Sequence, residues 1–337
     1  MHDDLYILIS AHKMQQKLQD ILVKNGFEQN RALQCADVFT TNSLEGVYTH
    51  GINRFPRFVN YVNDGFIKPN ANPILKNKFG GIEQWNGNLA PGISNAIHAT
   101  DRAMQLAQKY GIGCVALSNT NHWMRGGYYG RRAAKEDFIF IGFTNTIANM
   151  PAWKALDSRL GNNPLVLAMP YKDDPIVLDM AMSQYSFGAM ELSVMKNEKL
   201  SVPGGYTTDG QLTDDPAEIM KSKRPLPVGY WKGAGLALLL DLLAAVLSGG
   251  LSTHEITRQQ TEHSVSQVFI CIDKNKLNNS SVDQIIENII IDYKASIPIS
   301  KEDRIIYPAE RTRSKKETNT NDGIPVLKII WNEIFTL

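Results

Sequence analysis

Residues 114–141 read CVALSNTNHWMRGGYYGRRAAKEDFIFI, and this stretch decides the fold class. It begins with the apolar run 114–117 and ends with the apolar run 138–141, each of a length that suits a strand better than a helix. Runs that are apolar at every position are typical of strands buried on both faces of a sheet. Residues 165–169 and 176–178 repeat the pattern, so the sequence predicts an α/β domain whose loops gather around a site.

The glycines at 126–130 do not form a dinucleotide-binding fingerprint. The segment GGYYG has neither the G-x-G-x-x-G spacing nor the preceding strand context that this motif requires. The chain also has no P-loop, no H-E-x-x-H and no G-x-S-x-G. Any nucleotide cofactor is therefore expected to bind in a different way from that of the usual doubly wound domain.

Charge and cysteine content exclude several classes of protein. Lys and Arg number 35 against 34 Asp and Glu, so the chain lacks the basic surface expected of a nucleic-acid or anionic-membrane binder. Three scattered cysteines are too few for a disulfide framework or a structural zinc site, and no metal site is predicted. The first residues lack the features of a secretory signal. We expect a cytoplasmic protein without membrane or nucleic-acid partners.

Two segments carry further structural expectations. Residues 235–247 read GLALLLDLLAAVL, which is too short for a membrane span and contains Asp241, so we expect a helix buried on every side. Residues 311–322 are polar without an apolar period, so we expect an exposed loop. The predicted division is a helical terminal domain formed by 1–74 plus 251–337, and a sheet-containing cofactor-binding domain at 75–250.

The loop at 45–51 contains the first candidate catalytic group. His50 lies between Thr49 and Gly51, where an imidazole could act as a general acid or could be a surface residue. Arg54 follows it and could bind a substrate carboxylate, because its guanidinium fits that group with two hydrogen bonds. A solvated arginine at a helix start is the other interpretation.

Three further positions are candidates on residue type alone. His122 lies in a loop dense in hydrogen-bonding and aromatic groups, directly after a predicted strand, which favours a ligand pocket. Asp179 lies in an apolar run and needs a cation, a histidine or backbone N–H groups as partners. Lys232 precedes the apolar helix, where it could help to bind an anion such as a pyrophosphate or simply extend into solvent.

Six blocks taken together resemble the type-2 malate/L-lactate dehydrogenase family, in order and across nearly the whole chain. They are EGVYTHGINRFPRF (45–58), NHWMRGG (121–127), GNNPL (161–165), LDMAMS (178–183), GYWKG (229–233) and YPAER (307–311). The resemblance implies a homodimeric reductase of small 2-keto acids that uses NADH, with NADPH as the alternative. It also implies a non-Rossmann fold, with a mixed, largely antiparallel sheet domain and a helical domain built from the N- and C-terminal parts.

The resemblance also implies roles for individual residues. His50 matches the family's proton donor, and Arg54 and His122 match positions around the substrate. The cofactor-contacting stretches correspond to Pro175, Ile176, Val177, Leu178, Asp179, Met180 and Ala181, to Trp231 and Lys232, and to Ala309, Glu310 and Arg311. The chain departs from the family at Ala309 and Lys154, where glycine is more common.

These matches lead to a hypothesis for the reaction. Arg54 binds the carboxylate of a 2-keto acid, and protonated His50 donates to the oxygen of the C2 carbonyl as hydride reaches C2. Asp179 pairs with His50 and raises its pKa, while His122 polarises the carbonyl or holds a hydroxyl. The alternatives are a malate, lactate, ureidoglycolate or cyclic imino acid dehydrogenase of the same family, or a ligand-binding protein without catalysis.

Overall fold

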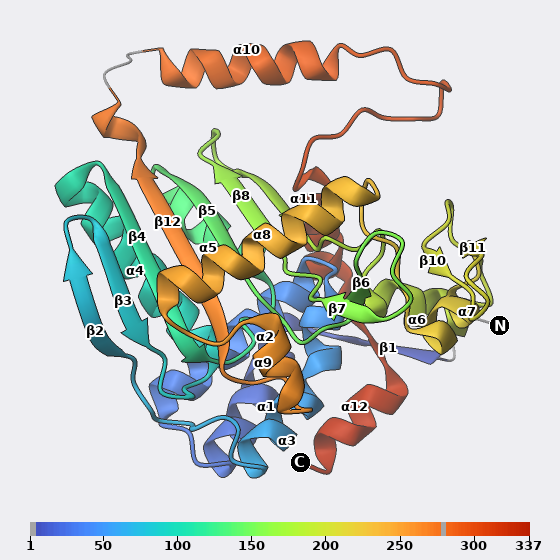
Figure 1. Ribbon diagram of the computed structural model, residues 1–337, viewed down its shortest axis with the longest axis horizontal. Coiled ribbons are helices and arrows are strands. Elements are labelled where there is room, and N and C mark those ends of the chain that lie inside the picture. The colour runs from blue at the N-terminus through green and yellow to red at the C-terminus, as the bar shows by residue number, and fades with distance from the viewer. Residues whose placement is uncertain (1–4, 278–280) are drawn as a thin grey trace.

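A computed structural model describes residues 5–277 and 281–337 of the chain (Figure 1). Its centre is a seven-stranded sheet of order β2-β3-β4-β12-β5-β8-β9. Only β3 and β4 are parallel, and every other neighbouring pair is antiparallel. This confirms the mixed, largely antiparallel α/β fold. The strands span Ile74–Phe79 (β2), Ile82–Asn86 (β3), Ile112–Thr120 (β4), Phe138–Thr144 (β5), Leu165–Met169 (β8), Ile176–Met180 (β9) and Val265–Asp273 (β12).

Helices cover both faces of this sheet. On one face, α4 (Gly92–Tyr110) packs on β4 and β12, and α5 (Gly126–Lys135) packs on β5 and β8. On the other face, α8 (Trp231–Ser248) crosses β4, β12 and β5 (Figure 1). Successive side chains of a strand point to opposite faces. Phe269 of β12 accordingly belongs to the first core and Val268 to the second, which explains why the strand sequences are apolar at every position.

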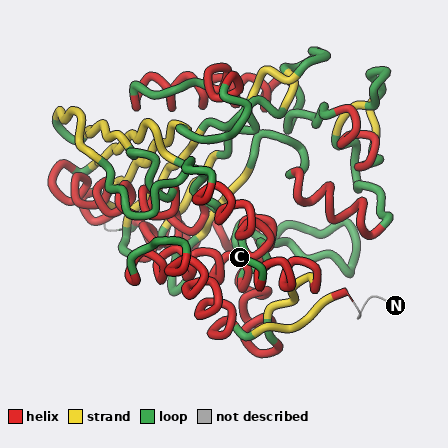
Figure 2. Tube along the Cα trace, turned by 90° about the horizontal axis from the view of Figure 1, so that it is seen from below, coloured by secondary structure: helices red, strands yellow, loops and turns green. Residues whose placement is uncertain are grey.

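The N- and C-terminal segments meet in a helical part whose buried side chains belong to the same hydrophobic core as those under α4 and α5. A two-stranded ladder of β1 (Tyr6–Ile9) and β13 (Ile324–Leu327) joins them, and Figure 2 shows this pair apart from the main group of strands. The buried face of α1 (Ala11–Lys24) carries Met14, Leu18, Ile21 and Leu22, at the spacing of an amphipathic helix. The other helices of this part are α2 (Gln29–Leu44), α3 (Phe55–Asn63), α11 (Glu310–Asp322) and α12 (Lys328–Phe335).

Smaller elements lie around the sheet. The segment after β9 forms α6 (Phe187–Lys196), β10 (Gly205–Tyr206), β11 (Leu212–Thr213) and α7 (Pro216–Ser222). The pair β6 (Met150–Pro151) and β7 (Ser158–Leu160) follows β5, and α9 (Thr253–Arg258) precedes β12. Helix α10 (Val282–Lys294) lies at the periphery in Figure 1, and Ile286 is its only buried residue.

The expected boundary at residue 251 separates β12 from the sheet to which it belongs. This strand was assigned to the terminal part, yet it pairs with both β4 and β5 at the middle of the sheet. Strand pairing across long sequence distances is not visible in local composition. The two-domain division otherwise remains a prediction.

Residues 311–322 were predicted as a loop, and this is wrong, because they form most of α11. The helix has no apolar stripe but is held by polar contacts. The buried Asn319 amide donates to the carbonyl of Leu44 at 2.9 Å, and Arg313 pairs with Asp174. Polar anchoring of this kind leaves no trace in hydrophobic periodicity.

The expectation that helix 235–247 is buried on every side is also wrong. Small residues of α8, such as Gly233, Ala237 and Ala244, face the sheet. The large side chains face outward, with exposed fractions from 38% to 72% at Leu236, Leu238, Leu239, Leu242, Leu243 and Val246. Within the described residues, α8 is the one helix long and apolar enough to cross a membrane, and such a single helix is weak evidence for a span. Asp241 accepts hydrogen bonds from Asn145 and from the Thr253 N–H.

Candidate active site

His50 and Arg54 lie on two successive 3-10 turns between α2 and α3. The turns span Tyr48–His50 and Ile52–Arg54, and the end of α2 fixes them. The Ser43 hydroxyl donates to the Phe39 carbonyl and accepts the Ile52 N–H, each at 2.8 Å. A Cβ at Gly51 would lie 2.3 Å from that hydroxyl oxygen, so only glycine allows this close approach. The orientation of both candidate side chains is thereby set by a rigid helix end.

His122 lies on the loop after β4, with its imidazole stacked on that of His50. The ring centroids are 5.6 Å apart and the planes meet at 19°. The Nδ1 atom of His122 accepts the Met124 N–H at 2.9 Å, so in the neutral ring the proton lies on Nε2. His122 is thereby preset as a hydrogen-bond donor through Nε2. The His50 Nδ1 lies 3.2 Å from the Thr49 hydroxyl.

Positive charge surrounds the two imidazoles. Burial, followed by the charges of Arg54 and Arg125, lowers the pKa of His50 to about 4. Burial also holds the pKa of His122 well below its usual range, followed by the charges of Arg54, His50 and Arg57. Both rings are therefore neutral at pH 7 in the unliganded chain. Arg54 lies near a carboxylate oxygen of Glu262, at 3.9 Å.

Asp179 does not provide the partner for His50 that the sequence hypothesis required. Its carboxylate accepts the Gly127 N–H at 2.7 Å and lies 3.7 Å from the Nε of Arg125. The pKa of His50 is lowered rather than raised, so the expected effect of Asp179 on this pKa is wrong. Burial raises the pKa of Asp179 itself, against the opposing effects of Arg125 and Gly127. A catalytic role for Asp179 remains a prediction.

A chain of buried ion pairs connects this region to the start of α11. Glu45 pairs with Arg125 and with Arg131 of α5. Arg131 pairs in turn with Asp174, which also pairs with Arg313 of α11 at 2.9 Å. These ion pairs form one network that joins the end of α2, α5, the turn before β9 and α11. Pairing offsets the cost of burying the charges.

One of the three predicted cofactor-contacting stretches forms β9, an edge strand of the sheet, and the other two lie next to residues that contact the chain just before and just after this strand. Pro175, Ile176, Val177, Leu178, Asp179, Met180 and Ala181 make up this strand and its flanks. Asp174 links the beginning of β9 to α11, whose first turn follows Ala309. At the other end, the Val228 N–H donates to the Met182 carbonyl and directs the chain into α8, where Trp231 and Lys232 are exposed. Segments far apart in the sequence therefore meet the chain at the two ends of β9.

The two departures from the family pattern share one backbone feature. Ala309 has φ 86° and Lys154 has φ 67°, both in the left-handed region that favours glycine. This backbone conformation would accommodate the glycine expected at both positions without strain. The chain keeps that conformation at a cost in strain.

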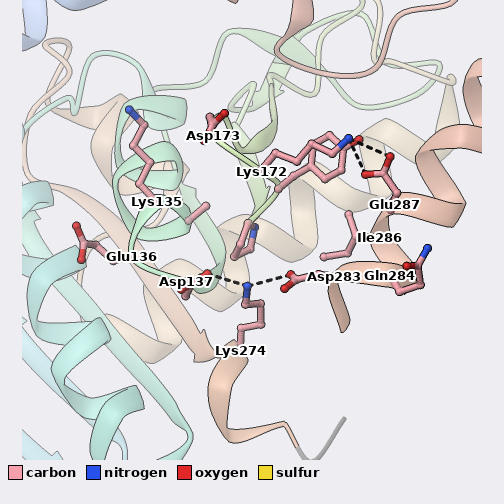
Figure 3. Close-up of a pocket in the computed structure, with 13 residues that line it drawn as sticks. Lys135, Glu136, Asp137, Lys172, Asp173, Lys274, Asp283, Gln284, Ile286 and Glu287 are labelled. Carbon is pink, nitrogen blue, oxygen red and sulfur yellow. Dashed lines mark hydrogen bonds and ion pairs between the residues drawn. The ribbon is translucent and has the colours of Figure 1, made fainter. Parts of the chain in front are cut away.

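A cavity of about 930 Å³ lies away from these residues, between α10, the end of α5 and the turn between β8 and β9 (Figure 3). Lys274 bridges Asp137 and Asp283 in its wall, and Lys172 binds Glu287. None of the candidate catalytic or cofactor residues lines it, so it is not the site described here. Within residues 5–277 and 281–337, no group of three or more His, Cys, Asp or Glu side chains is arranged to hold a metal ion.

Sequence reasoning missed Glu262, Arg131 and Asp174. Glu262 lies in a polar loop between α9 and β12 that carries no local signal, and only the fold brings it to Arg54. Arg131 and Asp174 also meet only through strand and helix packing. Glu45 and Arg125, by contrast, lie inside the blocks that contain His50 and His122, so their proximity could have been expected.

The paired imidazoles and the guanidinium of Arg54 are groups that can transfer a proton and bind an anion, and the comparisons with known proteins define the class. The model of the malate/L-lactate dehydrogenase family matches residues 9–335. The chain belongs to this family and is an oxidoreductase.

Two relatives and two solved structures define the likeness further. The chain is 40% identical over 332 residues to a 2,3-diketo-L-gulonate reductase of Klebsiella pneumoniae, covering 98% of this chain and 99% of the relative. It is 39% identical, with the same coverage, to a reductase of that name from Pasteurella multocida. Malate dehydrogenase from Pyrococcus horikoshii superposes with a TM-score of 0.89 at 26% identity, covering 99% of this chain and 96% of that one. The enzyme from Entamoeba histolytica has a TM-score of 0.92 at 23% identity, covering 98% and 97%, and shows the fold alone.

Proposed function

We propose that the protein is an NAD(P)H-dependent reductase of a small 2-keto acid, with 2,3-diketo-L-gulonate as substrate and 3-dehydro-L-gulonate as product. The observation that carries this proposal is the stacked pair His50 and His122 beside the guanidinium of Arg54. This arrangement offers a proton donor, a second hydrogen-bond donor and a carboxylate-binding group. The substrate follows from the near full-length relatives at 39–40% identity.

The residues along β9 fit a nicotinamide dinucleotide. The first turn of α8 has no side-chain cap, and the exposed Lys232 lies in it, a combination that suits a pyrophosphate. Trp231 is 65% exposed and offers an aromatic face. When bound, a reduced nicotinamide supplies the hydride. We propose NADH as the cofactor, with NADPH as the alternative, since no acidic or basic group that selects between them is evident.

The chain's own groups then account for binding and proton transfer. Arg54 binds the substrate carboxylate through its forked N–H groups and orients the C2 carbonyl toward the two imidazoles. The bound carboxylate offsets the positive charge of Arg54, which raises the pKa of His50 from its value in the unliganded chain. His50 then carries the proton that it donates to the developing alkoxide. The Nε2–H of His122 holds the carbonyl or a neighbouring hydroxyl.

A panel of substrates tests the proposal. The protein is incubated with NADH or NADPH and with 2,3-diketo-L-gulonate, oxaloacetate, pyruvate, a cyclic imino acid or, in the oxidative direction with NAD⁺ or NADP⁺, ureidoglycolate. We expect oxidation of the reduced cofactor, followed by its absorbance, to be fastest with 2,3-diketo-L-gulonate. Cofactor binding without turnover on any substrate would instead favour a non-catalytic ligand-binding protein.

We also propose a cytoplasmic homodimer in which α8 lies in the interface. Its outward leucines form an exposed apolar face of the kind that marks a contact between proteins. Replacing Leu239 and Val246 together by lysine is expected to yield monomers in sedimentation velocity, whereas the unmodified chain sediments as a dimer. Leu156, exposed on the loop between β6 and β7, gives the matched control, because its replacement by lysine leaves the dimer intact. A monomeric unmodified chain at micromolar concentration would exclude this interface.

A further inference from the structure

The buried carboxylate of Glu262 is the one acidic group paired with Arg54 among the described residues. Its Oε1 lies 3.9 Å from the Nη2 of Arg54, and its side chain is only 9% exposed. Its Oε2 accepts the Ile147 N–H at 3.1 Å. The long Arg54 contact is an ion pair rather than a hydrogen bond, so the guanidinium keeps its N–H groups for a ligand.

The segment that carries Glu262 is fixed at three successive residues. Ile147 holds Glu262 itself, and the ring of His263 stacks on Phe66 with 4.9 Å between centroids. The Ser264 hydroxyl donates to Asn119 at 3.0 Å. Because these three contacts hold the loop, the Glu262 carboxylate should keep its position when a ligand binds to Arg54.

We infer that Glu262 determines specificity by admitting keto acids with one carboxylate and disfavouring those with two. This inference rests on the proposed binding of the substrate carboxylate at Arg54. The first carboxylate is attracted by Arg54, whereas a second one brought near the same guanidinium meets the fixed negative charge of Glu262. Like charges placed together in a binding site are strongly disfavoured, and such repulsion is a common source of selectivity. A hydroxylated tail meets no such penalty, because a carboxylate accepts hydrogen bonds from hydroxyl groups.

The test compares two five-carbon keto acids, 2-oxopentanoate with one carboxylate and 2-oxoglutarate with two. Binding is measured by calorimetry without cofactor, and turnover is measured separately with NADH and NADPH. We expect the unmodified protein to bind 2-oxopentanoate more tightly. Glu262→Gln keeps an oxygen for the Ile147 N–H but removes the charge, and we expect it to shift the ratio of the two dissociation constants at least about tenfold toward 2-oxoglutarate.

Glu191→Gln is the matched control. Glu191 is an exposed carboxylate on α6 whose charge also reaches Arg54, yet solvent screens it. The Glu191→Gln substitution should leave the ratio of the two dissociation constants unchanged. A ratio that stays within about twofold in Glu262→Gln, or that shifts equally in Glu191→Gln, overturns the inference. A shifted binding ratio without turnover on any keto acid supports the role of Glu262 and rejects the proposed reductase activity. Failure of both keto acids to bind the unmodified protein overturns the inference, whereas the reductase activity is decided separately by turnover in the substrate panel.

Discussion

The imidazole of His122 stacks on that of His50 at 5.6 Å between centroids, with its Nδ1 already occupied by the Met124 N–H. The second histidine is therefore locked as a donor through Nε2, while the first keeps its freedom to exchange a proton. The two imidazoles therefore differ in their hydrogen bonding, because a backbone N–H fixes the proton position of His122 and not that of His50.

Replacing His50 by alanine is expected to lower kcat by about 10²–10⁴-fold, the usual contribution of a general acid. Cofactor affinity should change little, because the variant loses a proton donor and not a binding surface. Steady-state kinetics and fluorescence titration with NADH measure the two quantities. His254→Ala, at an exposed histidine of α9, serves as control and should retain full turnover. Near-normal kcat in His50→Ala would remove His50 from the donor role.

The pH dependence of kcat/KM follows the pKa of His50 in the free enzyme, which burial lowers to about 4. Reduction needs the protonated imidazole, so its kcat/KM should rise as the pH falls from 8 toward 5, by about tenfold per unit. Oxidation of the 2-hydroxy acid needs the neutral form and should stay constant over this range. The ordinary pKa of histidine is about 6.5. A reductive kcat/KM that stops rising once the pH falls below this value would contradict the prediction.

Arg54→Lys is expected to raise the KM of the keto acid about tenfold to a hundredfold, with a smaller effect on kcat. The lysine keeps the charge but loses the forked pair of N–H donors, and hydrogen bonds to charged groups contribute about 1.5–3 kcal/mol. Initial rates over a range of keto acid concentrations measure the effect. Arg57→Lys, at the exposed neighbour, should leave KM unchanged. An unaltered KM in Arg54→Lys would place the carboxylate elsewhere.

Glu45→Gln should destabilise the fold by about 3 kcal/mol, because it removes the negative charge that pairs with both Arg125 and Arg131 and leaves Asp179, at 3.7 Å, as the remaining carboxylate for Arg125. Urea denaturation followed by circular dichroism measures the free energy of unfolding. The pair between Arg159 and Asp157 is largely exposed, and Arg159→Ala is expected to cost less than about 1 kcal/mol. Equal losses in the two variants would show that the buried network is not a stabilising unit.

Ala309→Gly should stabilise the protein by about 1 kcal/mol, since a non-glycine residue pays roughly 1–2 kcal/mol in the left-handed region. Part of this gain is offset by the greater freedom of glycine in the unfolded chain. Ala295→Gly tests the same exchange at φ −76°, where it brings no relief of strain and should not stabilise. Thermal unfolding of both variants distinguishes the effects, and a loss of stability in Ala309→Gly would contradict the strain argument.

Local sequence determined the parts of the fold that depend on neighbouring residues. The apolar runs at 114–117 and 138–141 became β4 and β5 because a strand buried on both faces has no polar positions. The missing G-x-G-x-x-G pointed away from a doubly wound sheet. The ordered blocks around His50 and His122 indicated the family, and the histidine and arginine types made acid catalysis and anion binding candidate roles.

Only the tertiary structure decided which charges face one another. Glu262 meets Arg54 across more than two hundred residues of sequence, Asp179 turns to Arg125 rather than to His50, and β12 enters the middle of the sheet from a segment assigned to the other part of the chain. The apolar composition of α8 likewise did not show that its large leucines face outward and its small alanines face the sheet. The physical reason is that periodicity reports only that a side chain avoids water, whereas its partner is set by strand pairing and packing between segments far apart in the chain.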